Sequence, residues 1–225
     1  MSDMPLESIT VEPTRPATAC VIWLHGLGDS GAGFAPVVPA LGLPSDHSIR
    51  FIFPHAPEQA VTINGGYVMR AWYDIKSMAL HDRADLAGVM DSESQIVALI
   101  EAQIASGIAP NRIVLAGFSQ GGVMSLFCGL RLKYTLAGIM ALSCYLPTAD
   151  QMPVDLSAEN RATPILQQHG NQDEVVPLSA GVMAHELLKK EGYATQWQTY
   201  DMAHNVLPEQ LRDISKWLQK VLNIH

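Results

Sequence analysis

The chain is poor in cysteine and in cationic residues, and both scarcities narrow its possible functions. It has three cysteines among 225 residues and no Cys-x-x-Cys pair. An odd number of widely spaced cysteines in apolar stretches indicates buried thiols in a reducing compartment. Lysine and arginine number 14 against 22 acidic residues, for a formal net charge of −8. Because binding to a nucleic-acid backbone needs a basic face, we expect no nucleic-acid partner.

The sequence also lacks a membrane span and a secretion signal. No apolar run approaches the roughly 18 residues that a transmembrane helix needs. The first 16 residues, MSDMPLESITVEPTRP, contain acids and prolines and no apolar core of a signal peptide. We therefore expect a soluble, cytoplasmic protein without integral membrane association.

The apolar residues of the sequence occur in short, regular segments. Residues 1–225 are 48% apolar, which suits a single large α/β domain. Strand-like runs occupy 19–25, 49–54, 112–118, 136–144, 163–169 and 195–200. Helical patterns occupy 92–107, 119–133, 178–192 and 208–224. The first five strands are continuous apolar runs, which is typical of strands buried on both faces of a parallel sheet, whereas 195–200 alternates and suits an edge.

This alternation predicts a mostly parallel sheet with helices on both faces. Ligands on such sheets bind beyond the carboxyl ends of the strands, so the residues that follow each strand are the candidates for function. Residues 55–91 form the longest stretch without a clean period, and an insertion of this kind is often functional. Too few residues separate 136–144 from 163–169 to form a large lid domain.

A candidate nucleophile follows the strand at 112–118. Ser119 lies within Gly-Phe-Ser-Gln-Gly (117–121), a Gly-x-Ser-x-Gly pattern between a strand and a helix. In such an elbow the serine adopts a strained backbone, and small neighbours let strand and helix approach closely. The alternative is that Ser119 is only the N-cap of an ordinary helix.

A serine nucleophile needs a general base and an acid, which follow it in the order acid, then histidine. Asp173 follows the strand at 163–169, and His204 follows the strand at 195–200. Glu174 and Asp150 remain alternatives for the acid, and Asp201 is interpreted as a loop acid. These residues predict a Ser119–His204–Asp173 triad that acts without a metal or a cofactor.

The glycine-rich segment Gly-Leu-Gly-Asp-Ser-Gly (26–31) has two interpretations. It matches the dinucleotide-binding fingerprint, but an acid that would hold a ribose is missing from the end of the next strand, where His55 stands. The alternative is an oxyanion hole, in which the N–H of Leu27 joins that of Gln120, the residue after the nucleophile. The candidate triad favours the second interpretation.

Five segments together resemble the phospholipase/carboxylesterase family of α/β hydrolases, which includes bacterial carboxylesterases and eukaryotic acyl-protein thioesterases. They are HGLGDSG, FIFPHAPEQAVTINGGYVMRAWYDIK, LAGFSQGG, HGNQDEVVP and MAH, and the likeness extends from about residue 15 to the C-terminus. The resemblance implies the α/β-hydrolase fold, the same triad and the same two oxyanion donors.

The resemblance also implies that residues 61–76 form a flap beside an acyl pocket. Matching pocket positions are Leu27, Trp72, Ile75, Tyr145 and Val175, for which ordinary core packing is the alternative. Tyr145 stands where thioesterases of the family have tryptophan, so the resemblance does not carry over the shape of their acyl tunnel to this chain.

The expected activity is hydrolysis of carboxylic esters of short to medium acyl chains through an acyl-enzyme. The alternative is an acyl-protein thioesterase or a lysophospholipase acting on longer chains. The partner is then a small-molecule or lipid ester or thioester. An exposed apolar flap at 63–72 would also allow a homodimer.

Overall fold

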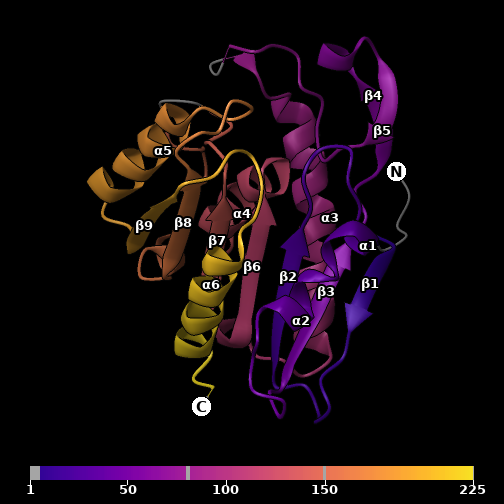
Figure 1. Cartoon of the computed structure of the whole chain (residues 1–225), viewed down its shortest axis with the longest axis vertical. Coiled ribbons are helices and arrows are strands. Elements are labelled where there is room, and N and C mark those ends of the chain that lie inside the picture. The colour runs from indigo at the N-terminus through magenta and orange to yellow at the C-terminus, as the bar shows by residue number, and fades with distance from the viewer. Residues whose placement is uncertain (1–5, 80–81, 149–150, 225) are drawn as a thin grey trace.

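Seven strands form one central sheet in which only one pair of neighbours is antiparallel (Figure 1). The computed structural model describes residues 6–79, 82–148 and 151–224. The strand order is β1-β3-β2-β6-β7-β8-β9. The strands are Ser8–Val11 (β1), Ala19–Leu24 (β2), Ile49–Pro54 (β3), Ile113–Phe118 (β6), Gly138–Leu142 (β7), Ile165–Gly170 (β8) and Thr195–Tyr200 (β9). The mostly parallel sheet expected from the sequence is confirmed.

Burial explains the composition of the strands. The five strands predicted from continuous apolar runs are the five interior strands, and every residue of β2, β7 and β8 is buried. β9, predicted to lie at an edge, does so and keeps an alternating pattern of exposure. The other edge is β1, which pairs antiparallel with β3 and aligns Ile9 with Phe53. β1 was not predicted because it is short and largely exposed.

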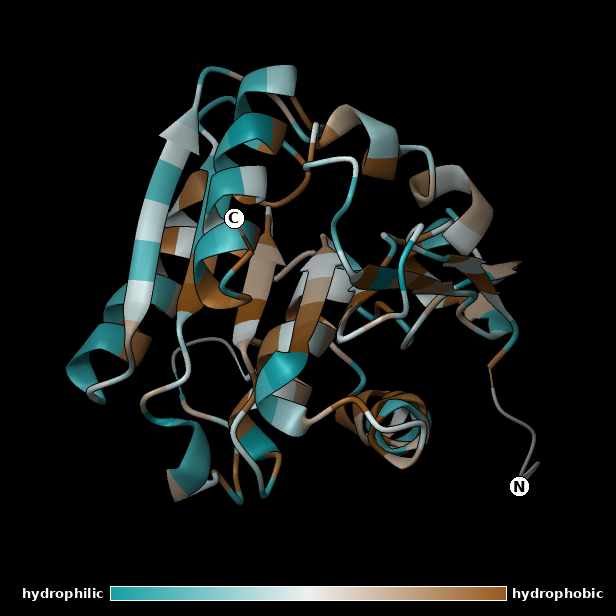
Figure 2. Ribbon diagram, turned by 90° about the horizontal axis from the view of Figure 1, so that it is seen from below, coloured by the Kyte–Doolittle hydropathy of each residue, from teal (hydrophilic) through white to brown (hydrophobic). Residues whose placement is uncertain are grey.

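Helices lie on both sides of the sheet (Figure 2). They are Gly31–Phe34 (α1), Val37–Ala40 (α2), Leu86–Ala105 (α3), Gln120–Arg131 (α4), Leu178–Lys190 (α5) and Pro208–Val221 (α6). One apolar cluster joins the sheet to α3, α4 and α5, and a second joins the opposite face to α2 and α6. The predicted apolar stripe of α6 is buried in the second cluster through Leu211, Ile214, Trp217 and Leu218.

Residues 55–91, which lack a clean period, differ most from expectation. Glu58–Val61 (β4) and Tyr67–Arg70 (β5) form an antiparallel hairpin at the upper right of Figure 1. Gly65 and Gly66 have φ values of 66° and 79°, a left-handed conformation that glycine adopts without strain. α3 begins at Leu86 rather than at residue 92, because the Asp85 carboxylate caps it by accepting from the Gly88 N–H at 3.2 Å.

All six parallel strands end at the upper edge of the sheet in Figure 1, and the hairpin lies beside this edge. Between β7 and β8 the described residues form loops and one short 3-10 helix, Ala158–Asn160 (η4), rather than a lid domain. Within the described ranges no helix is both long enough and apolar enough to cross a membrane.

The three cysteines are free and buried, as expected from the sequence. Burial raises the pKa of the Cys20 thiol to about 12 and the pKa values of Cys128 and Cys144 further. Since the thiolate is the nucleophilic form of cysteine, none of the three is suited to nucleophilic chemistry at neutral pH.

Candidate active site

Ser119 lies at a sharp turn between β6 and α4. Its φ of 55° and ψ of −120° place a non-glycine residue in a strained conformation. A Cβ atom on Gly117 would lie 2.0 Å from the Gly121 carbonyl oxygen, and one on Gly121 would lie 2.3 Å from that of Leu24. Glycine is therefore required at both positions. The Ser119 side chain makes no capping hydrogen bond to α4, so it does not act as an ordinary N-cap.

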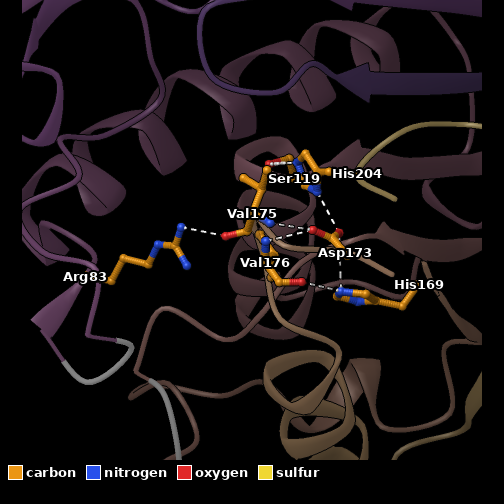
Figure 3. A network of polar contacts seen from close by, with 7 residues as sticks. All are labelled: Arg83, Ser119, His169, Asp173, Val175, Val176 and His204. Atoms are coloured by element: carbon orange, nitrogen blue, oxygen red, sulfur yellow. Dashed lines mark hydrogen bonds and ion pairs between the residues drawn. The ribbon is translucent and has the colours of Figure 1, made fainter. Parts of the chain in front are cut away.

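Three side chains from separate loops meet at this turn (Figure 3). The Ser119 Oγ lies 2.8 Å from the His204 Nε2. The His204 Nδ1 lies 2.7 Å from the Asp173 Oδ2, so Nδ1–H donates to the carboxylate and Nε2 is left to accept from serine. Both distances are within the range that proton transfer requires. The Phe118 ring packs against the His204 imidazole at 4.8 Å between centroids, which limits its rotation.

Asp173 is held in place more firmly than the competing acids that the structure describes, Glu174 and Asp201. Its side chain is fully buried, and its second oxygen, Oδ1, accepts from the N–H groups of Val175 and Val176 at 2.9 and 2.8 Å. Glu174 and Asp201, by contrast, are exposed. The remaining alternative, Asp150, lies outside the described residues. The structure thus brings together the three residues that the sequence predicts as a triad.

A second buried histidine supports Asp173 from below in Figure 3. His169 Nε2 lies 2.8 Å from the Val176 carbonyl oxygen and 3.5 Å from the Asp173 Oδ2. Burial lowers the pKa of His169, so the imidazole is neutral at pH 7 and donates its Nε2 proton to the Val176 carbonyl. The contact with Asp173 is then not an ion pair. The sequence showed only a histidine before a glycine, which does not predict this role.

The lowered pKa of His169 predicts how stability depends on pH. Below about pH 6.5 the unfolded chain binds a proton that the native chain does not, so the free energy of unfolding should fall as the pH falls. His169→Gln should reduce this slope by up to about 1.4 kcal/mol per pH unit. Urea denaturation of both proteins between about pH 7.5 and about pH 5 measures the slopes. Equal slopes would show that His169 already titrates normally in the native chain.

The two predicted oxyanion donors lie beside the serine. Leu27 and Gln120 both line the same cavity as Ser119, and neither backbone N–H donates a hydrogen bond to a described residue. The Gln120 side chain has a role that the sequence did not predict. Its Oε1 accepts from the Trp72 N–H at 2.8 Å, and its Nε2 donates to the Tyr73 carbonyl at 2.7 Å. The elbow is thereby joined to the loop after the hairpin.

A cavity of about 320 Å³ opens beside Ser119. Four of the predicted pocket residues line it, namely Leu27, Ile75, Tyr145 and Val175. Trp72 is not among the lining residues. It is 1% exposed and its indole N–H donates to the His25 carbonyl, as expected for core packing. The flap predicted at 61–76 contributes Ile63, Asn64 and Tyr73 to the cavity wall.

Arg83 is a lining residue that the sequence did not single out. It lies in the aperiodic segment, where no pattern indicates which side chains turn inward. In the part of the chain that the structure describes, no group of three or more His, Cys, Asp or Glu side chains could hold a metal ion.

A family model and similar proteins of known sequence both indicate to which family this chain is related. A model of the phospholipase/carboxylesterase family matches residues 6–222. Acyl-protein thioesterase 1 of Gibberella zeae is 41% identical over 217 residues, which cover 91% of each chain. Acyl-protein thioesterase 1 of Neurospora crassa is 42% identical over 214 residues, which cover 91% of this chain and 87% of that protein.

Solved structures give the same result. The crystal structure of Arabidopsis thaliana SOBER1 superposes with a TM-score of 0.86 at 31% identity and covers 91% of this chain and 99% of its own. That of Zea mays acyl-protein thioesterase 2 has a TM-score of 0.82 at 25% identity and covers 96% and 99%. The chain therefore belongs to the phospholipase/carboxylesterase family, whose members are serine hydrolases with the α/β-hydrolase fold.

Proposed function

We propose that this chain hydrolyses carboxylic esters of short to medium acyl chains through an acyl-enzyme formed on Ser119. The observation that carries the proposal is the unbroken hydrogen-bonded series from Ser119 Oγ through His204 to Asp173, at 2.8 and 2.7 Å. A serine hydroxyl is a weak nucleophile alone and becomes effective when a histidine takes its proton.

The mechanism follows from these contacts. Ser119 Oγ attacks the acyl carbon while His204 Nε2 takes the hydroxyl proton, and Asp173 stabilises the resulting imidazolium. The negative charge on the tetrahedral oxygen is stabilised by the N–H groups of Leu27 and Gln120, each worth about 3–4 kcal/mol in the transition state. His204 then protonates the leaving alcohol, and a water activated by the same histidine releases the acid.

The preference for short to medium chains rests on the cavity. Its volume of about 320 Å³ lies at the small end of the range for ligand pockets. Tyr145 is 3% exposed, and its hydroxyl is hydrogen-bonded to that of Tyr73 at 3.0 Å, so both rings stay in the wall. A long acyl chain would have to leave the cavity and lie over the exposed hairpin.

A second candidate is hydrolysis of acyl thioesters on proteins. It is favoured by the two relatives above 40% identity, both of which bear the name acyl-protein thioesterase 1. A thioester and an oxygen ester of the same acid give the same acyl-enzyme on Ser119, so the triad serves both. The exposed side chains of Tyr67 and Val68 on the hairpin would provide an apolar surface for a longer chain.

The distinguishing experiment is a substrate series. We expect p-nitrophenyl esters to show the highest kcat/KM between butyrate and octanoate, with a drop of about 10-fold or more toward palmitate. The same acyl groups as thioesters, followed with a thiol reagent, compare the two leaving groups. An optimum at palmitate, or activity confined to thioesters, would favour the second candidate. No turnover of any member would contradict the proposed function.

Two further expectations remain proposals. We place the enzyme in the cytoplasm, a location with which its three free, buried cysteines agree.

We also propose that a homodimer forms through the exposed hairpin residues Tyr67 and Val68. Sedimentation velocity tests the dimer, and a monomer at all concentrations would contradict it.

A further inference from the structure

One wall of the cavity contains a cation, Arg83, that forms no ion pair with any residue the structure describes. Arg83 is 5% exposed and lines the cavity beside Ser119. In the described part of the chain, the arginines that form ion pairs are Arg15, Arg50 and Arg131, and Arg83 is not among them. Buried charges in proteins are normally paired, because leaving water without a partner is costly. A buried guanidinium at a cavity wall, without an ion pair among the described residues, therefore requires an explanation.

The hydrogen bonds of Arg83 leave part of its guanidinium unused. Its Nη2 donates to the Val175 carbonyl at 3.0 Å, as Figure 3 shows. Its Nε is buried and has no hydrogen-bond partner among the described residues. The guanidinium carbon lies 5.3 Å from the centre of the Tyr145 ring, a contact that only partly compensates for the charge. An arginine has five N–H donors, so several remain available.

Two phenols beside Arg83 add a further donor. The hydroxyls of Tyr73 and Tyr145 both belong to cavity-lining residues and are hydrogen-bonded to each other at 3.0 Å. Burial raises the pKa of both phenols, so both keep their protons. One proton is used between them, and the other has no acceptor among the described residues. Arg83, Tyr73 and Tyr145 thus provide guanidinium and phenol donors in the wall of this cavity.

The backbone holds Arg83 in this position. The Arg83 carbonyl accepts from the Lys76 N–H at 3.0 Å, and the next residue, Ala84, forms a bridge with Ile75. The side chain itself is held by the bond from its Nη2 to the Val175 carbonyl and is only 5% exposed. The charge is therefore retained where a bound substrate would meet it.

We infer that Arg83 is a specificity residue that binds a carboxylate at the far end of the acyl group. The preferred substrates would be half-esters of dicarboxylic acids, with the ester carbonyl at Ser119 and the free carboxylate on Arg83. The planar guanidinium matches a carboxylate in shape and charge. The inference rests on the proposed function, because it names the acyl group that the same site accepts.

Two electrostatic features oppose this binding, namely the net charge of the chain and the carboxylate of Glu174. The formal net charge of the chain is −8, which disfavours anionic substrates in general. Glu174 also lines the cavity but is exposed, so solvent and salt screen its carboxylate. Arg83 is buried, and its interaction with an anion is screened much less.

The experiment compares monomethyl with dimethyl esters of dicarboxylic acids from succinic to suberic acid, with hydrolysis followed by titration of the released acid. The two substrates of each pair have nearly the same length and differ by one charge. We expect wild type to prefer the monomethyl ester of the best-fitting length by about 10- to 100-fold in kcat/KM. A dimethyl ester cleaved equally well or better would overturn the inference.

Variants of Arg83 test whether this residue causes the preference for the monomethyl ester. Arg83→Gln should remove the preference, mainly by raising KM for the monomethyl ester, so that the ratio of the two kcat/KM values falls toward one. Arg83→Lys keeps the positive charge and should therefore retain part of the preference for the monomethyl ester. Arg15→Gln is the matched control, because Arg15 is exposed and lies outside the cavity wall. It should behave as wild type does.

The outcomes also separate this inference from the proposed function. Equal loss on both substrates in Arg83→Gln would mean that Arg83 only supports Val175, and the subsite would be rejected. Labelling of Ser119 by a fluorophosphonate at the wild-type rate checks that the variant still has a working triad. If wild type cleaves neither ester and takes no label, the proposed function itself fails.

Discussion

Ser119→Ala is expected to lower kcat for the best ester by about 10⁵-fold. The substitution removes the nucleophile and leaves the oxyanion donors in place, so a small residual rate above that of water should remain. Steady-state hydrolysis of p-nitrophenyl butyrate measures the loss, and fluorophosphonate labelling should disappear with it.

The folded structure should survive this substitution. Ser119 uses its backbone, and not its side chain, in the contacts that anchor the elbow, because its N–H donates to the Leu142 carbonyl at 2.8 Å. The φ of 55° is strained for alanine as it is for serine, so the melting temperature should change little. Hydrolysis by Ser119→Ala at the wild-type rate would show that the Ser119 hydroxyl is not the nucleophile.

Asp173→Asn is expected to lower kcat by about 10⁴-fold. An asparagine fits the space, but its NH₂ group cannot accept the Nδ1 proton of His204. If it turns its oxygen toward His204, its NH₂ faces the N–H groups of Val175 and Val176, which now contact the Asp173 Oδ1 at 2.9 and 2.8 Å. Either orientation breaks a contact, so the wrong imidazole tautomer becomes populated.

Glu174→Gln is the matched control for this prediction. Glu174 is adjacent in sequence and carries the same functional group, but it is exposed and makes no hydrogen bond with His204. We expect its kcat to remain within about 3-fold of wild type on neutral esters. A loss in Glu174→Gln as large as that in Asp173→Asn would mean that the acid has been assigned to the wrong residue.

The fold was predictable where the packing of an element produces a regular pattern of apolar residues in the sequence. The interior strands are continuous apolar runs because helices cover both of their faces, and α6 has a single apolar stripe because only one side meets the sheet. The hairpin of β4 and β5 has no such pattern, since in Tyr67–Arg70 two exposed residues are followed by two partly buried ones, without alternation. The short helices α1 and α2 are too brief for periodicity to appear.

The candidate site was predictable to the extent that it depends on chain order. Ser119, Asp173 and His204 each follow a parallel strand, and the ends of such strands converge. The side-chain contacts of Gln120 and Arg83 were not predictable, because they join segments that are 47 and 92 residues apart. No local pattern records such a contact. Trp72 illustrates the same limit, since a large aromatic residue beside the pocket proves to be packed in the core.

The Gln120 amide has a consequence for how new acyl preferences could evolve or be engineered. Both of its bonds go to main-chain atoms, the Trp72 N–H and the Tyr73 carbonyl. Any residue except proline supplies the N–H at position 72, and any residue supplies the carbonyl at position 73. The side chains that shape the cavity can therefore be exchanged while the frame that holds them to the nucleophile turn stays intact. Selectivity and turnover are separable by mutation at this wall, which makes positions 73 and 75 suitable for library design.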